Sequence, residues 1–583
     1  MNRKQRRATL KQSPPASRRA TPGGEPAGDL FAQAVRSQQQ IQLAEATRLY
    51  KRLLARKPDH AQASNNLGCV LHAQGKLNEA SAWFAHSLTL IPQLFDQFRG
   101  VCATLVGVLP PIGEAIRRTN AAWPNRLTAD QLLGSAWLSV IAADPLLLCL
   151  LQSTPVREIA LERVLTALRL ALLEASADAS KPVSDAALAF CCALAKQCFI
   201  NEYVFATTPE EDAQVERLES SLADAINATA AIAPILIAAI AMYRPLHELP
   251  FAQQLFDRSW PLALDDVLTQ QLREPGQERE LRSTIPRLTP IDDDVSLRVQ
   301  QQYEENPYPR WVNVAGQIEP IALDQHMRNK FPTVAFTPLG KTESLDILVA
   351  GCGTGLQAAQ TAQGYQGARV LAVDLSLSSL CYAKRKTPSP LSDRIEYAQG
   401  DILKLGVIGR SFDMIEVAGV LHHMHDPFEG WRVLLSLLRP GGLMYLGFYS
   451  ESARRDVVAA RAFIAEHGYA ATPADIRRCR QELLKTPLGS VARFFDFFST
   501  SECRDLLFHV QESRVTIPAI KAFIDGHGLK FIGFDLDDSA AQNFRNLFAA
   551  NGWSMTDLHK WHAVETQHPN TFSGMYHLWV QKS

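Results

Sequence analysis

The stretch from Asp346 to Gly355 constrains the fold of this chain more than any other. Its apolar run Ile347–Ala350 indicates a buried parallel strand, and Gly351, Gly353 and Gly355 then form a turn. Glycine has no Cβ, so the backbone there bends sharply and lets a ligand approach closely. Apolar residues with helical spacing follow, so the N-terminus of a helix faces the loop. Its free N–H groups favour a carboxylate or a phosphate.

A second predicted strand, 369–374, ends in an acid. Asp374 lies 19 residues after Gly355, the usual distance for a carboxylate that accepts hydrogen bonds from ribose hydroxyls. Further strands are predicted at 395–399, 412–417 and 443–448. Asp426-Pro427 begins a helix before the last of them, and the sequence Arg-Pro-Gly-Gly at 439–442 ends it.

In these motifs, residues 345–448 resemble the core of class I S-adenosylmethionine-dependent methyltransferases. The matching features are the GCGTG loop, the strand-end acid, Gly400-Asp401, the VLHH turn and RPGG. The resemblance implies a Rossmann-like α/β sheet that binds S-adenosylmethionine across its strand ends. It also implies the cofactor-binding residues: Gly351, Gly353 and Gly355 at the methionine part, Asp374 at the ribose, Leu375, Asp401 and Ile402 around the adenine, and Gly419.

Two alternatives remain beside this interpretation. Residues 353–358 also fit the dinucleotide fingerprint G-x-G-x-x-A, which predicts a nicotinamide enzyme. The VLHH turn and the helix-RPGG-strand ending favour the methyltransferase. Val349 stands where the family usually has an acid, which leaves open a domain that holds the cofactor as a sensor or scaffold without chemistry.

Catalytic candidates follow strands four and five. If the methyl acceptor is an amine, it must lose a proton first, and His422 and His423 are the best general-base candidates. Tyr449 and Glu451 come next. The alternative for the two histidines is a structural role in helix packing.

A proline-stiffened segment, 303–311, stands just before the domain core. Tyr308, Arg310 and Trp311 project from it, and its position is typical of a lid over the cofactor, where aromatic faces favour the sulfonium cation. The alternative is a rigid linker packed on the sheet.

The methyltransferase domain is predicted at 298–583, with its core at 345–448 and 516–583. Insertions at 450–515 and 537–573 stand where loops reach the active site and are expected to select the substrate. The cluster 493–498, rich in phenylalanine, is a candidate pocket lining or a core.

An internal repeat covers the N-terminal part. Ala34, Ala46, Tyr50, Leu54 and Pro58 correspond to Gly68, Ala80, Phe84, Leu88 and Pro92 at a spacing of 34 residues. This resembles tetratricopeptide repeats, which predicts a repeat region at 29–125 with a degenerate third unit after residue 92. Such a region docks a protein partner or substrate, or it serves as a helical spacer or dimerisation arm.

The remaining segments are a basic N-terminal tail and a helical middle region. Residues 1–28 are expected to be a disordered basic tail, and 126–297 an all-helical middle region without chemistry of its own. The apolar run 228–243 is too short to span a membrane.

Composition excludes several classes of function. Of the 583 residues, 46% are hydrophobic and the net charge is −1, so nucleic-acid binding is not expected. Ten cysteines without a C-x-x-C pair predict reduced thiols in a cytoplasmic protein, and no metal site is expected. The methyl acceptor and the oligomeric state stay open.

Overall fold

The computed structural model of this chain describes residues 27–91, 106–107, 111–142, 144–177, 183–314, 319–536, 544 and 554–583. Contacts divide the chain into two units, Met1–Leu90 and Ile91–Ser583, and each is described by itself. The predicted basic tail, up to residue 26, lies outside the described residues. The predicted domain boundaries at 125 and 297 stay predictions.

The first unit consists of paired helices. They are α1 (Ala27–Gln39), α2 (Leu43–Leu54), α3 (Ala61–Ala73) and α4 (Leu77–Leu90). The repeated positions are buried, among them Ala46, Tyr50, Ala80 and Phe84. Gly68 is required by packing, because a Cβ there would lie 3.0 Å from the ring of Phe84. The region is all-helical as predicted, and residues 93–105 and 108–110 of the proposed third repeat lie outside the described residues.

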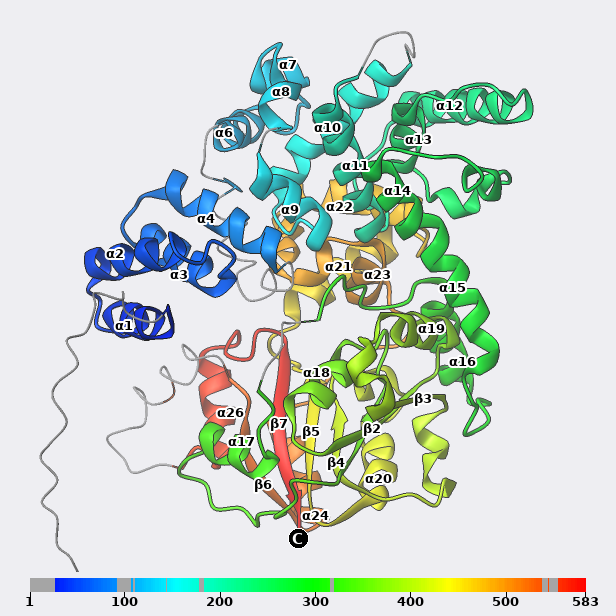
Figure 1. Cartoon of the computed structure of the whole chain (residues 1–583). Helices are drawn as coiled ribbons and strands as arrows, with labels where there is room; N and C mark the ends of the chain where they lie inside the picture. The colour runs from blue at the N-terminus through cyan, green and yellow to red at the C-terminus, as the bar shows by residue number, and fades with distance from the viewer. Residues whose placement is uncertain are drawn as a thin grey trace, which may run out of the picture. The chain divides into compact units, whose positions relative to one another are not determined.

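The second unit contains a seven-stranded sheet of order β3-β2-β1-β4-β5-β7-β6, shown in Figure 1. All pairs are parallel except those of β7, which runs antiparallel to both β5 and β6. The strands are β1 (Leu345–Ala350), β2 (Ala368–Asp374), β3 (Ile395–Gln399), β4 (Phe412–Val417), β5 (Leu438–Tyr449), β6 (Leu529–Phe534) and β7 (Met575–Lys582). The Rossmann-like sheet is therefore confirmed.

Helices cover both faces of this sheet. One hydrophobic core joins it to α17 (Leu323–Lys330), α18 (Leu356–Gly364) and α19 (Leu377–Lys386). The other joins it to α20 (Pro427–Leu437), α24 (Ile517–Gly526) and α26 (Leu558–Gln567). Both cores keep the strands buried, which explains why their sequences are almost continuously apolar.

The start of β5 differs from the prediction. Residues 439–442 were expected to precede this strand, but β5 already begins at Leu438, which pairs with Phe412. The register then shifts before Met414 pairs with Leu443, so the Pro-Gly-Gly sequence lies in a bulge.

Helices also fill the region before the sheet and the first insertion. The middle helices are α6 (Ile112–Ala122), α7 (Ala129–Leu133), α8 (Trp137–Ile141), α9 (Pro145–Ser153), α10 (Ile159–Ser176), α11 (Asp185–Ile200), α12 (Pro209–Asn227), α13 (Pro234–Ala241), α14 (Leu262–Leu268) and α15 (Glu274–Leu281), followed by α16 (Asp294–Glu305). The cap insertion, residues 450–515, contains α21 (Arg455–His467), α22 (Pro473–Leu483) and α23 (Thr500–Phe508) around its own apolar core.

A buried ion pair joins the cap insertion to the middle helices. Arg480 on α22 donates to both carboxylate oxygens of Glu162 on α10, at 2.9 and 3.1 Å. The same guanidinium donates to the carbonyls of Val204 and Phe497. The middle helices therefore fix the orientation of the cap insertion above the sheet.

No helix among the described residues is long and apolar enough to cross a membrane.

Candidate functional site

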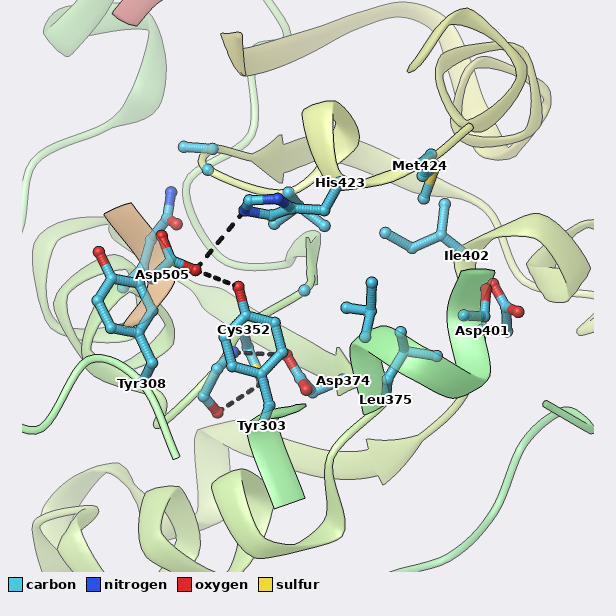
Figure 2. A pocket seen from close by; sticks show the side chains of 18 of the residues that line it. Tyr303, Tyr308, Cys352, Asp374, Leu375, Asp401, Ile402, His423, Met424 and Asp505 are labelled. Atoms are coloured by element: carbon cyan, nitrogen blue, oxygen red, sulfur yellow. Dashed lines mark hydrogen bonds and ion pairs between the residues drawn. The ribbon is translucent and has the colours of Figure 1, made fainter. Parts of the chain in front are cut away.

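A cavity of about 530 Å³ opens at the carboxyl ends of the strands. This is the edge where open α/β sheets bind their ligands, and the volume suits a small molecule. Figure 2 shows the cavity, with Asp374, Leu375, Asp401 and Ile402 on one side and Tyr303, Tyr308, His423 and Asp505 on the other. The predicted residues that line it are Gly351, Gly353, Asp374, Leu375, Asp401, Ile402, Gly419, His423 and Tyr449.

The glycine loop is shaped by close neighbours. A Cβ at Gly351 would lie 2.4 Å from Val420, and one at Gly353 would lie 2.5 Å from the carbonyl oxygen of Tyr308. Gly355 also has a positive φ, of +84°. A Cβ there would lie 2.6 Å from Ala383 and 3.0 Å from the hydroxyl of Tyr397, at the N-cap of α18. Gly355 is not among the residues that line the cavity, and its predicted contact with the methionine part stays a prediction.

Asp374 lies at the end of β2 and holds the glycine loop. Its carboxylate accepts from the N–H groups of Gly353, at 2.7 Å, and Ser376, at 2.8 Å. Burial raises its pKa to about 6, although these backbone N–H groups oppose the shift. A carboxylate has about four acceptor positions, so this one retains capacity for ribose hydroxyls.

The opposite end of the cavity suits a purine base. Leu375 and Ile402 offer apolar walls, and Asp401 is buried. Asp401 Oδ1 accepts from the N–H of Leu403, and no partner with good hydrogen-bond geometry meets Oδ2 in the described part of the chain. Burial raises the pKa of this carboxyl, and the nearby Ser296 hydroxyl lowers it by a smaller amount. An acceptor left unpaired in a buried site fits an exocyclic amino group, so the residues present fit an adenosyl ligand.

The raised pKa of Asp374 predicts a pH dependence of ligand binding. Above about pH 6 its carboxylate is ionised and accepts strongly; below that value it is protonated. The affinity for S-adenosylmethionine should therefore fall as the pH decreases from 7.5 to 5, by up to about tenfold if the bound pKa is one unit lower. Calorimetry at both values measures this effect. The Asp374→Asn variant should show a flat profile, and a flat wild-type profile would contradict the assignment.

The segment before the core lies over the glycine loop, as a lid would. The N–H of Thr354 donates to the carbonyl of Tyr308, its hydroxyl donates to the carbonyl of Pro309, and Trp311 donates to the carbonyl of Thr354. Tyr308 and Pro309 line the cavity, but Arg310 and Trp311 do not. Arg310 instead forms an ion pair with Glu202, 3.1 Å away.

The two adjacent histidines have different surroundings. His423 lines the cavity, and its Nδ1 lies 3.0 Å from the carbonyl oxygen of Gln511. In the neutral ring this contact places the proton on Nδ1 and leaves a lone pair on Nε2. His422 is fully buried against Tyr449, with the rings stacked at 3.5 Å, and it does not line the cavity. Burial lowers the pKa of both imidazoles, so both are neutral at pH 7.

The cap insertion supplies two acids to the site: Asp496, which belongs to the candidate pocket lining 493–498, and Asp505, which sequence reasoning missed. Asp496 and Asp505 line the cavity opposite the glycine loop, and Tyr303 on α16 joins them. The hydroxyl of Tyr303 donates to Asp505 at 2.5 Å, and that of Tyr308 donates to Asp496 at 3.1 Å. The sequence signal for Asp496 was its position as an acidic residue within a run of phenylalanines. Nothing local marks Asp505.

Among the described residues, His423, Asp505 and His509 have ligand atoms within 4.8 Å of one another, a spacing compatible with a metal ion. The hydrogen bonds disfavour that use. Nδ1 of His509 accepts from the N–H of Gln511, so the neutral ring carries its proton on Nε2, which lies 3.2 Å from the hydroxyl of Tyr303. A protonated Nε2 has no lone pair for a metal.

Val349, the departure from the family pattern, lies beside a buried acid. In the sheet it is the register partner of Glu416 on β4. Glu416 accepts from the hydroxyl of Thr361 on α18 at 2.6 Å, and burial raises its pKa to about 7. The neighbouring strand thus carries a carboxyl group in register with Val349, and this group is bound to α18.

Comparisons with known proteins point to one family for this domain. Residues 348–446 match the family described as "Methyltransferase domain". An uncharacterized protein of Synechococcus sp. is 27% identical over 274 residues, 43% of this chain and 63% of the relative. A ubiquinone biosynthesis O-methyltransferase of Coxiella burnetii is 32% identical over 158 residues, 27% of this chain and 64% of the relative.

Among solved structures, PKMT2 from Rickettsia typhi in complex with AdoHcy is 17% identical. The TM-score is 0.34, with 45% of this chain and 54% of that chain covered. The chain spans 63% and 64% of the two curated relatives, so their matches describe the domain and not the whole protein.

Proposed function

We propose that this chain, whose C-terminal half holds a class I S-adenosylmethionine-dependent methyltransferase domain, transfers a methyl group to an acceptor bound beneath its cap insertion. One observation supports this most. The cavity that holds the predicted adenosyl-binding residues also holds Tyr303, Asp496 and Asp505 on its opposite side. A cofactor sensor would need the first group of residues only.

S-adenosylmethionine brings an already activated methyl group, so the protein mainly supplies position and a dry site. Asp374 and the glycine loop hold the donor. The cap insertion and the lid exclude water from the opposite side of the cavity. Nε2 of His423 is available as a general base for an acceptor that must lose a proton.

We further propose that the repeated helices α1–α4 dock a protein substrate or partner. Their 34-residue period and buried small residues are typical of tetratricopeptide repeats, which bind protein segments. The alternative is a small-molecule methyltransferase in which these helices are structural or dimerise.

Labelling with tritiated S-adenosylmethionine tests both proposals. Full-length protein and a variant lacking residues 1–90 are each incubated with cell lysate, and the products are separated by size. We expect a labelled protein band with the full-length protein and its loss with the truncated one, at similar cofactor affinity. Label in the same small molecule for both proteins would reject docking and keep methyl transfer. Absence of label in all fractions would reject methyl transfer.

A further inference from the structure

The acceptor side of the cavity carries two carboxyl groups without a cationic partner. Asp505 is buried; the pKa of Asp496 is raised chiefly by burial and further by the charge of Asp505 nearby. Among the described ion pairs, no Lys or Arg nitrogen lies within 4.0 Å of either carboxylate. Arg157 and Arg454 act on Asp496 from a longer range, and each is paired with another acid, Glu502 and Glu512 respectively. Buried acids are normally paired directly, so this arrangement leaves space for a positive charge between the two carboxylates.

Tyrosines hold these two acids and leave acceptor positions free. Asp496 accepts from Tyr308, and Asp505 accepts from Tyr303 and, at 3.4 Å, from Tyr449. The rings of Tyr303 and Tyr308 are stacked with centroids 6.3 Å apart. An ammonium group has three donors and is attracted to aromatic faces. A phenolate or carboxylate acceptor would instead be repelled by the two acids.

A second cavity of about 940 Å³ adjoins this place. The two cavities share the side chains of Tyr308, Pro309, Leu356, Gln360 and Asp496 as lining. The second cavity lies between the lid, the cap insertion and α9. Its aromatic side chains Trp311, Phe494 and Phe495 suit the apolar part of a chain whose end reaches Asp496. Three arginines also line it, and each is paired with an acid: Arg157 with Glu502, Arg310 with Glu202 and Arg493 with Asp456.

We infer that the methyl acceptor is a primary amine at the end of an aliphatic chain, held between Asp496 and Asp505. This inference rests on the proposed methyl transfer and names its substrate class. The chain enters through the second cavity, and the tyrosine rings surround the amine. Two sources share this chemistry: a lysine side chain of a polypeptide and a free alkylamine.

Groups in the cavity account for the proton and the electron pairs of this reaction. The bound ammonium first loses one proton to Nε2 of His423, directly or through Asp505, whose Oδ1 lies 3.8 Å from that nitrogen. The amine lone pair then forms the N–C bond while the C–S bond breaks, and the electron pair of that bond stays on sulfur. The product is a methylammonium, whose charge the two carboxylates stabilise.

Binding of simple probes tests the inference without knowledge of the natural substrate. The full-length protein is saturated with S-adenosylhomocysteine, and the Kd values of 1-aminohexane and 1-hexanol are measured at pH 8. We expect the amine to bind at least tenfold more tightly. Asp496→Asn and Asp505→Asn should each remove most of this preference. The exposed-acid control Asp525→Asn should keep it.

Labelling then separates the two sources of the amine. It also distinguishes a failure of the amine inference from a failure of the proposed methyl transfer. With tritiated S-adenosylmethionine, a lysine-centred peptide, 1-aminohexane and catechol are offered in parallel. Label in the peptide alone identifies a polypeptide lysine, and label in 1-aminohexane identifies a free alkylamine. Label in catechol alone, equal binding of 1-aminohexane and 1-hexanol, or no binding of either together with no label in the peptide, overturns the amine inference but keeps methyl transfer. A wild-type protein that fails to bind S-adenosylmethionine overturns the proposed function instead.

Discussion

Asp374→Ala is expected to weaken the binding of S-adenosylmethionine by about a hundredfold or more. The substitution removes a charged acceptor for ribose hydroxyls, and each such hydrogen bond contributes about 1.5–3 kcal/mol. Two of them amount to about 3 kcal/mol at the lower limit, and every 1.4 kcal/mol is tenfold in Kd. The variant also releases the N–H of Gly353, which Asp374 holds at 2.7 Å, so the loop beneath the methionine part loses its anchor.

Calorimetry with S-adenosylmethionine measures this loss, and circular dichroism checks that the variant is folded. Asp525→Ala is the matched control, because this acid is exposed and pairs only with Lys521 on the same helix among the described ion pairs. A Kd for Asp374→Ala within threefold of the wild-type value would mean that Asp374 does not contact the ribose.

Arg480→Met is expected to reduce the free energy of unfolding by about 3–5 kcal/mol. Removing one partner of a buried ion pair leaves the other charge uncompensated, here that of Glu162. The substitution also leaves the carbonyls of Val204 and Phe497 without their donor. Because this ion pair joins the cap insertion to the middle helices, the loss should loosen the acceptor side of the cavity as well.

Urea unfolding followed by tryptophan fluorescence measures the change in stability. Arg478→Met on the same helix is the control: its side chain is 66% exposed, and its ion pair with Asp475 should contribute less than about 1 kcal/mol. The double variant Glu162→Met/Arg480→Met should recover part of the loss, because no buried charge is left unpaired. Equal stability of Arg480→Met and Arg478→Met would refute this account.

The strands and the cofactor side of the cavity were predictable because their signals are local. The strands at 395–399 and 412–417 have the predicted bounds, since each is a short stretch rich in apolar residues that ends close to a glycine, Gly400 and Gly419 respectively. The start of β5 was missed because its bulge depends on pairing with Phe412 in another strand. The spacing of Asp374 to the glycine loop was enough to predict that it ends a strand and lines the cavity.

The acceptor side was not predictable to the same extent. Asp505 is brought to Tyr303 across 202 residues, and only the packing of the cap insertion decides that they meet. His422 and His423 are adjacent in the sequence and similar in pattern. Which of them faces the cavity follows from the carbonyl of Gln511 and the ring of Tyr449, and neither contact is visible in a motif.

The link between Glu162 and Arg480 has a consequence for how the protein is made. The two residues are 318 positions apart, and at about 5–20 residues per second a ribosome needs roughly 16–64 s to synthesise the intervening chain. During that time the nascent middle helices expose the surface that α22 later covers. We expect them to be the segment that chaperones bind during synthesis, with release timed by the emergence of the cap insertion.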